Sequence, residues 1–286
     1  MEKNIIPIKT DKINSVVTIV PIFDTHILNP TFDKEMYKKC INYIANKDAT
    51  YWFGGGDYGE FIKIKDKRFN ALSCYPDLKV KDLARIVDLE REIFEEETGP
   101  ILNPEKCLGL GEGNHDIKIS KEGDGEIVRD LCTAHNVRYL GYSGFIKLVF
   151  SRGASTTSRS FTIYYHHGWS AARMTGGKVN YIERMAKDND CNIAVTGHCH
   201  TRVTTGPIDI PSMNSNKPLL KYGIICGSWK RGVGWGKMTW EETRGYGQDY
   251  HRMGTWAIQI IPFPSNNQTI TFRVIPFDAE WVGIGL

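Results

Sequence analysis

The stretch Leu108-Gly109-Leu110-Gly111-Glu112-Gly113-Asn114-His115-Asp116 decides the fold, because polar side chains of three chemical types follow a short apolar run in it. Residues 106–110 are expected to form a short strand. The loop after this strand then delivers an amide, an imidazole and a carboxylate. These are groups that bind metals and move protons in hydrolytic enzymes.

Four other groups of polar residues share this arrangement, two before the stretch and two after it. They are Asp24-Thr25-His26, Gly55-Gly56-Asp57, His166-His167-Gly168 and Gly197-His198-Cys199-His200. Each follows a short apolar or β-branched run, as a loop at the end of a strand does. The five loops together offer carboxylate, imidazole and amide ligands, which are the types that hold a pair of divalent transition metals.

Helical and strand patterns alternate early in the chain, and strands dominate late. The expected strands are residues 16–23, 49–53, 106–110, 145–150, 160–165, 192–196, 202–205, 219–226, 255–261 and 269–275. The expected helices lie after Thr31, a plausible N-cap, then before Gly99-Pro100, over residues 125–135, and after Gly176-Gly177-Lys178. This order predicts an α/β protein with two stacked sheets and helices outside.

Composition excludes several classes of protein. A length of 286 residues with 41% hydrophobic and 24% charged residues suits one soluble α/β domain over residues 1–286. The net charge of +3 is too small to argue for a nucleic-acid partner. Seven scattered cysteines without C-x-x-C spacing suit a reducing compartment. No signal-peptide core or bilayer-length apolar run is present, so we expect a cytoplasmic protein with no membrane partner.

The ordered motifs D-x-H, G-D, G-N-H-D, H-G and G-H-x-H, carried by residues 24–200, resemble the signature of the calcineurin-like metallophosphoesterase superfamily. One such motif is weak evidence, but five in this order are specific. The resemblance implies a four-layer α/β/β/α sandwich of two mixed sheets and a phosphoester substrate. It also implies a water or hydroxide shared by two metals as the nucleophile, with phosphodiesters as the first choice of substrate.

The same resemblance implies which residues act. The first metal would be held by Asp24, His26, Asp57 and His200, and the second by Asp57, Asn114, His167 and His198. Asp57 would bridge both metals, because two nearby cations need an anion between them. Imidazole ligands favour manganese, iron, zinc or nickel over magnesium or calcium, and manganese is our first expectation. His115 would protonate the leaving oxygen, and Asp116 would orient His115.

Three positions allow more than one interpretation. Strand alternation prevents His166 and His167 from both facing one site, and we favour His167, which directly precedes Gly168. Arg173 and Lys178 could contact a substrate phosphate or lie in a solvated loop, and the two interpretations are weighed equally. A nucleotide P-loop is rejected at Gly176-Gly177-Lys178, because Val179 and Asn180 follow the lysine.

Two long stretches have no assigned part in the metal site. Residues 58–100 are expected to be an insertion whose glutamates, Glu90, Glu92, Glu95, Glu96 and Glu97, form a solvated face. The alternative is that this charged helix caps the site or meets a partner. Residues 227–254 place tryptophans such as Trp229 and Trp235 among lysines and arginines, which could stack a nucleobase or pack over the sandwich edge. A nucleotide or nucleic acid is therefore a possible substrate.

Rival functions keep the same fold. A DNA nuclease of the superfamily, a phosphomonoesterase, and a non-catalytic scaffold such as a retromer subunit would each resemble this chain. The filled ligand positions and the presence of His115 argue against the scaffold.

Overall fold

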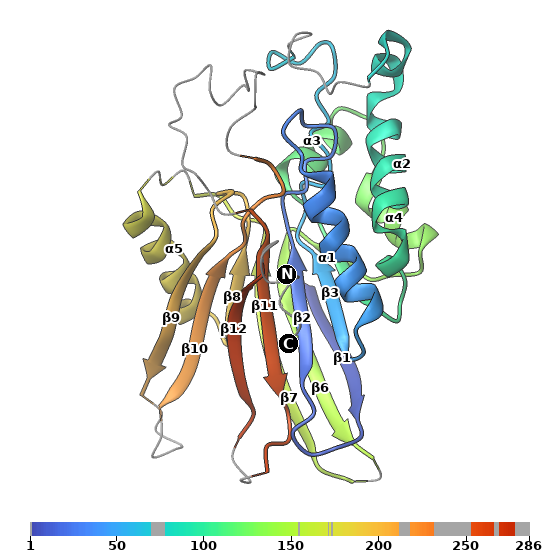
Figure 1. Ribbon diagram of the computed structural model, residues 1–286. Coiled ribbons are helices and arrows are strands. Elements are labelled where there is room, and N and C mark those ends of the chain that lie inside the picture. The colour runs from blue at the N-terminus through green and yellow to red at the C-terminus, as the bar shows by residue number, and fades with distance from the viewer. Residues whose placement is uncertain are drawn as a thin grey trace.

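The computed structural model describes residues 2–69, 78–153, 155–170, 172, 174–211, 218–231, 253–265 and 269–277. These residues form two six-stranded mixed sheets that lie face to face (Figure 1). The first sheet has the order β1 (Glu2–Thr10), β6 (Ser143–Arg152), β7 (Ser158–His166), β8 (Ile193–Thr196), β10 (Leu219–Ile225) and β9 (Val203–Ile210). The second has the order β12 (Thr271–Phe277), β11 (Thr255–Ile261), β2 (Val17–Ile22), β3 (Thr50–Gly54), β4 (Cys107–Gly111) and β5 (Tyr139–Gly141).

Helices cover the outer face of each sheet (Figure 1). The helix α5 (Thr175–Asp188) packs on the first sheet. The second sheet is covered by α1 (Lys34–Asn46), α2 (Ile86–Thr98), α3 (Asn114–Lys121) and α4 (Ile127–Ala134). The predicted four-layer α/β/β/α sandwich of two mixed sheets is therefore confirmed.

Alternation along β2 shows how the chain builds two cores at once. All six of its residues are buried. Val17 and Ile19 face the first sheet and join the core between the sheets, whereas Val20 and Ile22 face the helices. A strand buried on both faces carries a nearly continuous apolar run, which explains why the sequence pattern identified it.

The expected strands and helices are present, with three added elements and one different helix cap. The structure adds β1, β5 and the helix α3, which begins inside the Gly113-Asn114-His115-Asp116 loop. Thr31 does not cap α1, because its hydroxyl donates to Asn29 Oδ1 at 2.7 Å. Asp33 is the N-cap instead, and its Oδ1 accepts a hydrogen bond from the Met36 amide at 3.0 Å.

The helix expected in the insertion is present. It consists of a 3₁₀ turn, η2 (Val80–Arg85), followed by the α-helix α2, and a second 3₁₀ turn, η3 (Gly99–Ile101), follows α2. The expectation of a wholly solvated glutamate face is wrong. Glu90 is 2% exposed, and its Oε2 accepts from the Phe61 amide at 2.8 Å. Glu97 is 6% exposed and pairs with Lys34 Nζ at 2.7 Å. Both carboxylates are buried because they meet donors on the segments against which α2 packs.

None of the helices that the structure describes combines the length and apolar character needed to span a membrane.

Candidate metal centre

The five ligand loops meet at one end of the sandwich, where α3 begins (Figure 1). Three loops follow the parallel strands β2, β3 and β4 of one sheet. The other two follow β7 and β8, which are parallel neighbours in the second sheet. Loops after parallel strands emerge at the same edge, and such an edge is the usual site of ligand binding in α/β proteins. The arrangement of the strands therefore brings together Asp24 and His200, which are 176 positions apart in the sequence.

The backbone of these loops is unusual. Positive φ angles of 47° to 65° occur at five predicted ligands: Asp24, His26, Asp57, His198 and His200. Residues with side chains avoid this left-handed region, which costs about 1–3 kcal/mol each. Such conformations gather at functional sites, where the surrounding structure holds them in place. Here the turns aim the ligand side chains toward one another.

Two glycines make this close approach possible. Gly56 has φ +96°, and a Cβ there would lie 2.0 Å from the Gly113 nitrogen. A Cβ on Gly113 would lie 2.1 Å from Asp57 Oδ1. Both distances are below van der Waals contact, so only glycine fits at either position.

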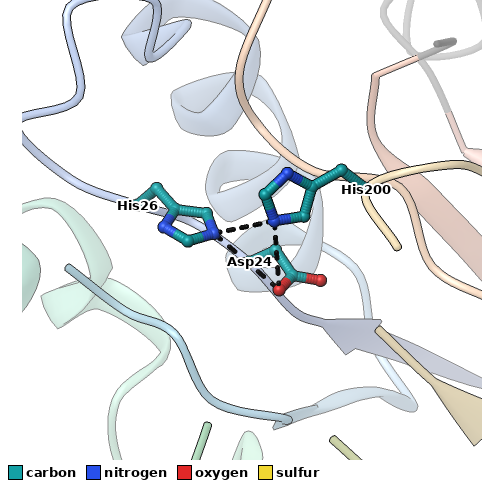
Figure 2. Close-up of side chains that lie close together, drawn as sticks. All are labelled: Asp24, His26 and His200. Carbon is teal, nitrogen blue, oxygen red and sulfur yellow. Dashed lines mark hydrogen bonds and ion pairs between the residues drawn. The ribbon is translucent and has the colours of Figure 1, made fainter. Parts of the chain in front are cut away.

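The first half of the centre consists of Asp24, His26 and His200 (Figure 2). Nε2 of His26 lies 2.9 Å from Nε2 of His200, and Asp24 Oδ1 lies 3.8 Å and 3.6 Å from these two nitrogens. Burial, together with the positive charge of Lys230, lowers the pKa of His26 well below its ordinary value. A neutral ring is the form that binds a metal.

The buried atom Asp24 Oδ1 tests whether a cation fits. Asp24 is fully buried, and its Oδ2 accepts a hydrogen bond from the His198 amide at 2.8 Å. Its Oδ1 has no hydrogen-bond partner among the described residues. An unpaired carboxylate oxygen away from water is costly unless a cation or a donor meets it. With two imidazole nitrogens converging on the same oxygen, a divalent metal satisfies all three atoms.

The second half consists of Asp57, Asn114, His167 and His198. The Asn114 side-chain oxygen lies 3.1 Å from His167 Nε2 and 2.8 Å from His198 Nδ1. Asp57 Oδ2 lies 3.2 Å from His167 Nε2. His167 donates its Nδ1 hydrogen to the Gly55 carbonyl at 2.8 Å, which turns Nε2 toward these oxygens. Although burial favours the neutral ring, the Asp57 carboxylate and the Gly55 carbonyl raise the pKa of His167 to about 10, so this position attracts positive charge.

Asp57 links the two halves through one oxygen. Its Oδ2 lies 4.0 Å from His26 Nε2 in the first half and 3.2 Å from His167 Nε2 in the second. Its Oδ1 accepts a hydrogen bond from the His115 backbone amide at 2.8 Å. The carboxylate therefore presents a single oxygen to both halves, and the other oxygen fixes its orientation.

The structure places His167 in this cluster and turns His166 away from it. The Nδ1 atom of His166 accepts from the Gly168 amide at 2.9 Å, and its ring packs against Trp169 with 4.4 Å between ring centroids. Burial and the neighbouring His167 lower the pKa of His166 to about 4. Alternation along a strand explains the opposite directions of the two rings.

Exchanging each of these histidines for alanine gives a direct prediction. We expect His167→Ala to weaken binding at the second half of the centre by more than the roughly 10- to 100-fold that loss of an outer-shell partner costs. We expect His166→Ala to leave binding nearly unchanged, because it removes only the hydrogen bond from the Gly168 amide and the ring packing against Trp169 and Tyr142. Calorimetric titration with Mn²⁺ measures both. Equal weakening in the two variants would contradict the assignment of His167.

His115 lies beside the centre with its ring held in one orientation. Its Nδ1 atom donates to the Glu60 carbonyl oxygen at 2.8 Å, which leaves Nε2 on the other side of the ring. Its ring centroid is 4.9 Å from that of His26. The positions of His26, Asp57 and His115 would also permit a shared metal, so a ligand role for His115 has to be tested against a catalytic one.

Asp116 does not orient His115, contrary to the expectation. Its Oδ2 accepts from the backbone amides of Asp57 and Gly113, both at 2.7 Å. Burial and the nearby Asp57 carboxylate raise the pKa of Asp116 to about 7. As the third helical residue of α3 it reaches back to the N-cap amide, and in doing so it ties the Asp57 loop to the helix start. Asp116 therefore positions the backbone of the proposed bridge.

The residues considered for substrate contacts are either buried or outside the described part of the chain. Lys178 is only 4% exposed, and its Nζ donates to the Thr201 hydroxyl at 2.6 Å, so it does not lie in a solvated loop and its ammonium group is engaged with the protein. Arg173 lies outside the described residues. Trp229 is fully buried and packs edge-on against Tyr37 with 5.1 Å between centroids, so it cannot stack a base. Trp235 also lies outside the described residues.

The sequence did not identify Glu60. Its Oε1 lies 3.4 Å from His26 Nδ1 and accepts from Asn29 Nδ2 at 2.5 Å and from Lys230 Nζ at 3.4 Å. Nδ1 of His26 has no hydrogen-bond partner among the described residues, so the Glu60 carboxylate lies near the ring without a hydrogen bond to it. The only signal in the sequence is its position three residues after Asp57.

No protein-family model matches the chain, and no curated protein matches it by sequence. Solved structures do match. Vps29 complexed with zinc from Entamoeba histolytica is 9% identical, with 91% of this chain and 99% of that chain covered and a TM-score of 0.38. GAP50, the anchor in the inner membrane complex of Plasmodium, is 12% identical, with 91% and 84% covered and a TM-score of 0.44. A metallophosphoesterase from Sphaerobacter thermophilus is 12% identical, with 92% and 89% covered and a TM-score of 0.36.

These are similarities of fold, at 9–12% sequence identity.

Proposed function

We propose that the chain is a dinuclear metal-dependent phosphoesterase that favours phosphodiesters and accepts phosphomonoesters second. The observation that carries the proposal is the single oxygen of Asp57 that faces both clusters of ligands, at 4.0 Å from His26 Nε2 and 3.2 Å from His167 Nε2. A shared carboxylate oxygen between two sets of imidazoles suits two cations better than one. The donor set favours manganese, with iron, zinc or nickel as alternatives.

Separate groups of residues have separate roles in the proposed reaction. Two divalent metals at these ligands would supply Lewis-acid activation of water and neutralise charge on the phosphoryl group. His115 would donate a proton from Nε2 to the leaving oxygen in its doubly protonated form, because Nδ1 already carries the hydrogen that is donated to the Glu60 carbonyl. Asp116 fixes the Asp57 and Gly113 amides, and Glu60 lies beside His26 with its Oε1 3.4 Å from Nδ1. As the bond from phosphorus to the leaving oxygen breaks, this proton passes from His115 to that oxygen.

The buried Trp229 cannot stack on a base, so it does not support a preference for nucleotide diesters. We keep a simple phosphodiester as the proposed substrate class. A scaffold without activity would need neither His115 beside the centre nor a buried carboxylate oxygen aimed into it.

Metal analysis followed by a substrate panel tests the proposal. We expect about two transition-metal ions per chain after loading with Mn²⁺, and Mn²⁺-dependent hydrolysis of bis(p-nitrophenyl) phosphate that exceeds hydrolysis of p-nitrophenyl phosphate. Single-stranded DNA, double-stranded DNA and cyclic nucleotides complete the panel. Two bound ions without hydrolysis of any substrate would favour the scaffold, and preference for the monoester would make the chain a phosphomonoesterase.

A further inference from the structure

Arg68 brings a positive charge from the insertion to the edge of the metal centre. Its Nη1 lies 3.3 Å from Nε2 of His115. In the neutral ring Nδ1 donates to the Glu60 carbonyl, so Nε2 accepts and the guanidinium donates. When Nε2 carries the proton for the leaving oxygen, this contact is broken and the Arg68 Nη1 donor is released. The arginine thus contacts the nitrogen that the proposed reaction uses.

A buried carboxylate holds this guanidinium in place. Asp66 has a side chain that is 5% exposed, and it accepts from Arg68 Nη2 at 2.9 Å, from Nε at 3.3 Å and from the Arg68 backbone amide at 2.9 Å. Lys118 of α3 donates to the same carboxylate. This geometry is far more restrictive than that of an exposed ion pair.

The helix that carries the ligands also anchors this part of the insertion. Asn114 and His115 lie in the first turn of α3, and Lys118 and Glu122 lie at its other end. Lys118 pairs with Asp66, and Glu122 pairs with Lys63 at 2.5 Å. Arg68 is therefore fixed relative to His115 by contacts with the same short helix, rather than by the loop alone.

Arg68 retains donors that point to no other described residue. A guanidinium has five N–H groups. Asp66 accepts hydrogen bonds from the N–H of Nε and from one N–H of Nη2, and His115 accepts one from Nη1. One N–H on each terminal nitrogen remains, and the side chain is 22% exposed. Two such donors match the spacing of two oxygens on a phosphoryl group.

We propose that Arg68 is a substrate-binding residue that donates hydrogen bonds to an anionic oxygen of the phosphoester, and that Asp66 is its positioning residue. The inference rests on the proposed function, since it takes the phosphoryl group to lie between the ligand clusters and His115. The insertion then contributes directly to the binding of the phosphate. The competing interpretation is that the Arg68 contact with His115 only fastens the insertion to the domain.

Binding of inorganic phosphate to the metal-loaded protein separates these interpretations. We expect Arg68→Gln to raise the Kd for phosphate by about 10- to 100-fold, the usual worth of a charge-assisted hydrogen bond. Arg68→Lys should recover only part of the affinity, because lysine keeps the positive charge but lacks the paired N–H donors of the guanidinium group. The control is Arg85→Gln, an arginine of the same insertion that is half exposed and pairs with Glu92. It should bind phosphate as the wild type does.

Kinetics give a second readout. Arg68→Gln should raise KM more than it lowers kcat, and it should penalise p-nitrophenyl phosphate more than bis(p-nitrophenyl) phosphate, because the monoester carries more negative charge. Asp66→Asn should act in the same direction but more weakly, since the arginine remains but is less well held. Metal content and thermal unfolding of every variant are measured alongside, so that loss of fold is recognised.

The outcomes are distinct from those of the proposed function. An unchanged phosphate Kd and KM in folded, metal-replete Arg68→Gln overturns the inference and leaves the phosphoesterase intact. Loss of phosphate affinity in the same variant supports the inference even if the wild type hydrolyses none of the esters tested.

Discussion

Asp57→Asn is expected to empty both halves of the metal centre and to abolish hydrolysis. Asparagine keeps the shape of the side chain and can still accept from the His115 amide through its oxygen. It lacks the negative charge that Asp57 Oδ2 presents to His26 and His167. Because this oxygen lies 4.0 Å from His26 Nε2 and 3.2 Å from His167 Nε2, metal affinity should fall at both positions by more than about 100-fold, which exceeds the cost of losing an outer-shell partner.

The measurement combines metal content with turnover of bis(p-nitrophenyl) phosphate. Both should fall together, because Asp57 Oδ2 lies beside a histidine of each half. Asp48→Asn is the matched control, since Asp48 is exposed and its contact with Thr50 uses only its backbone carbonyl. Two tightly held ions with full activity in Asp57→Asn would falsify the bridging role. Loss of one ion alone would assign Asp57 to a single position.

The sequence was sufficient to predict the cluster of ligands, because their order along the chain follows the order of the strands. Loops after the parallel strands β2, β3 and β4 must emerge at one edge, and the loops after β7 and β8 meet them there. An alternation argument likewise separated His166 from His167, since neighbouring strand residues face opposite sides. These inferences depend on local geometry and on motif order, which a single sequence contains.

Elements that depend on tertiary contacts were not predictable. The strand β1 has a charged and irregular sequence and exists through its pairing with β6, more than 140 residues away. The helix α3 buries only Asp116 and Ile119, so it has no apolar periodicity to reveal it. Propensity and pattern give no signal where distant partners decide the conformation.

The surroundings of the centre were also beyond the sequence. Asp116 was expected to orient His115, but its carboxylate meets the backbone amides of Asp57 and Gly113. Trp229 was considered as a base-stacking residue, but it fills the core beside Tyr37. Composition shows which groups are present and not whether they are exposed. Arg68 became a candidate only because α3 holds its segment against His115.

His115→Ala is expected to retain the metals and to slow turnover by about 10²- to 10⁴-fold, the usual worth of a general acid. The variant keeps the contact that matters for metal binding, because the hydrogen bond to Asp57 Oδ1 comes from the His115 backbone amide. It loses the imidazole whose Nδ1 is anchored on the Glu60 carbonyl and whose Nε2 would carry the proton. Chemistry and metal binding should therefore separate in this variant.

The leaving group provides the sharper test. A good leaving group such as p-nitrophenolate departs without needing a proton, whereas an alkoxide needs one. The loss in kcat should therefore be smallest for bis(p-nitrophenyl) phosphate and should grow as the pKa of the leaving alcohol rises. His135→Ala is the control, since His135 lies at the surface and pairs with Glu95 at 3.0 Å. If His115→Ala loses metal as well as activity, His115 is a ligand together with His26 and Asp57, and another group must protonate the leaving oxygen.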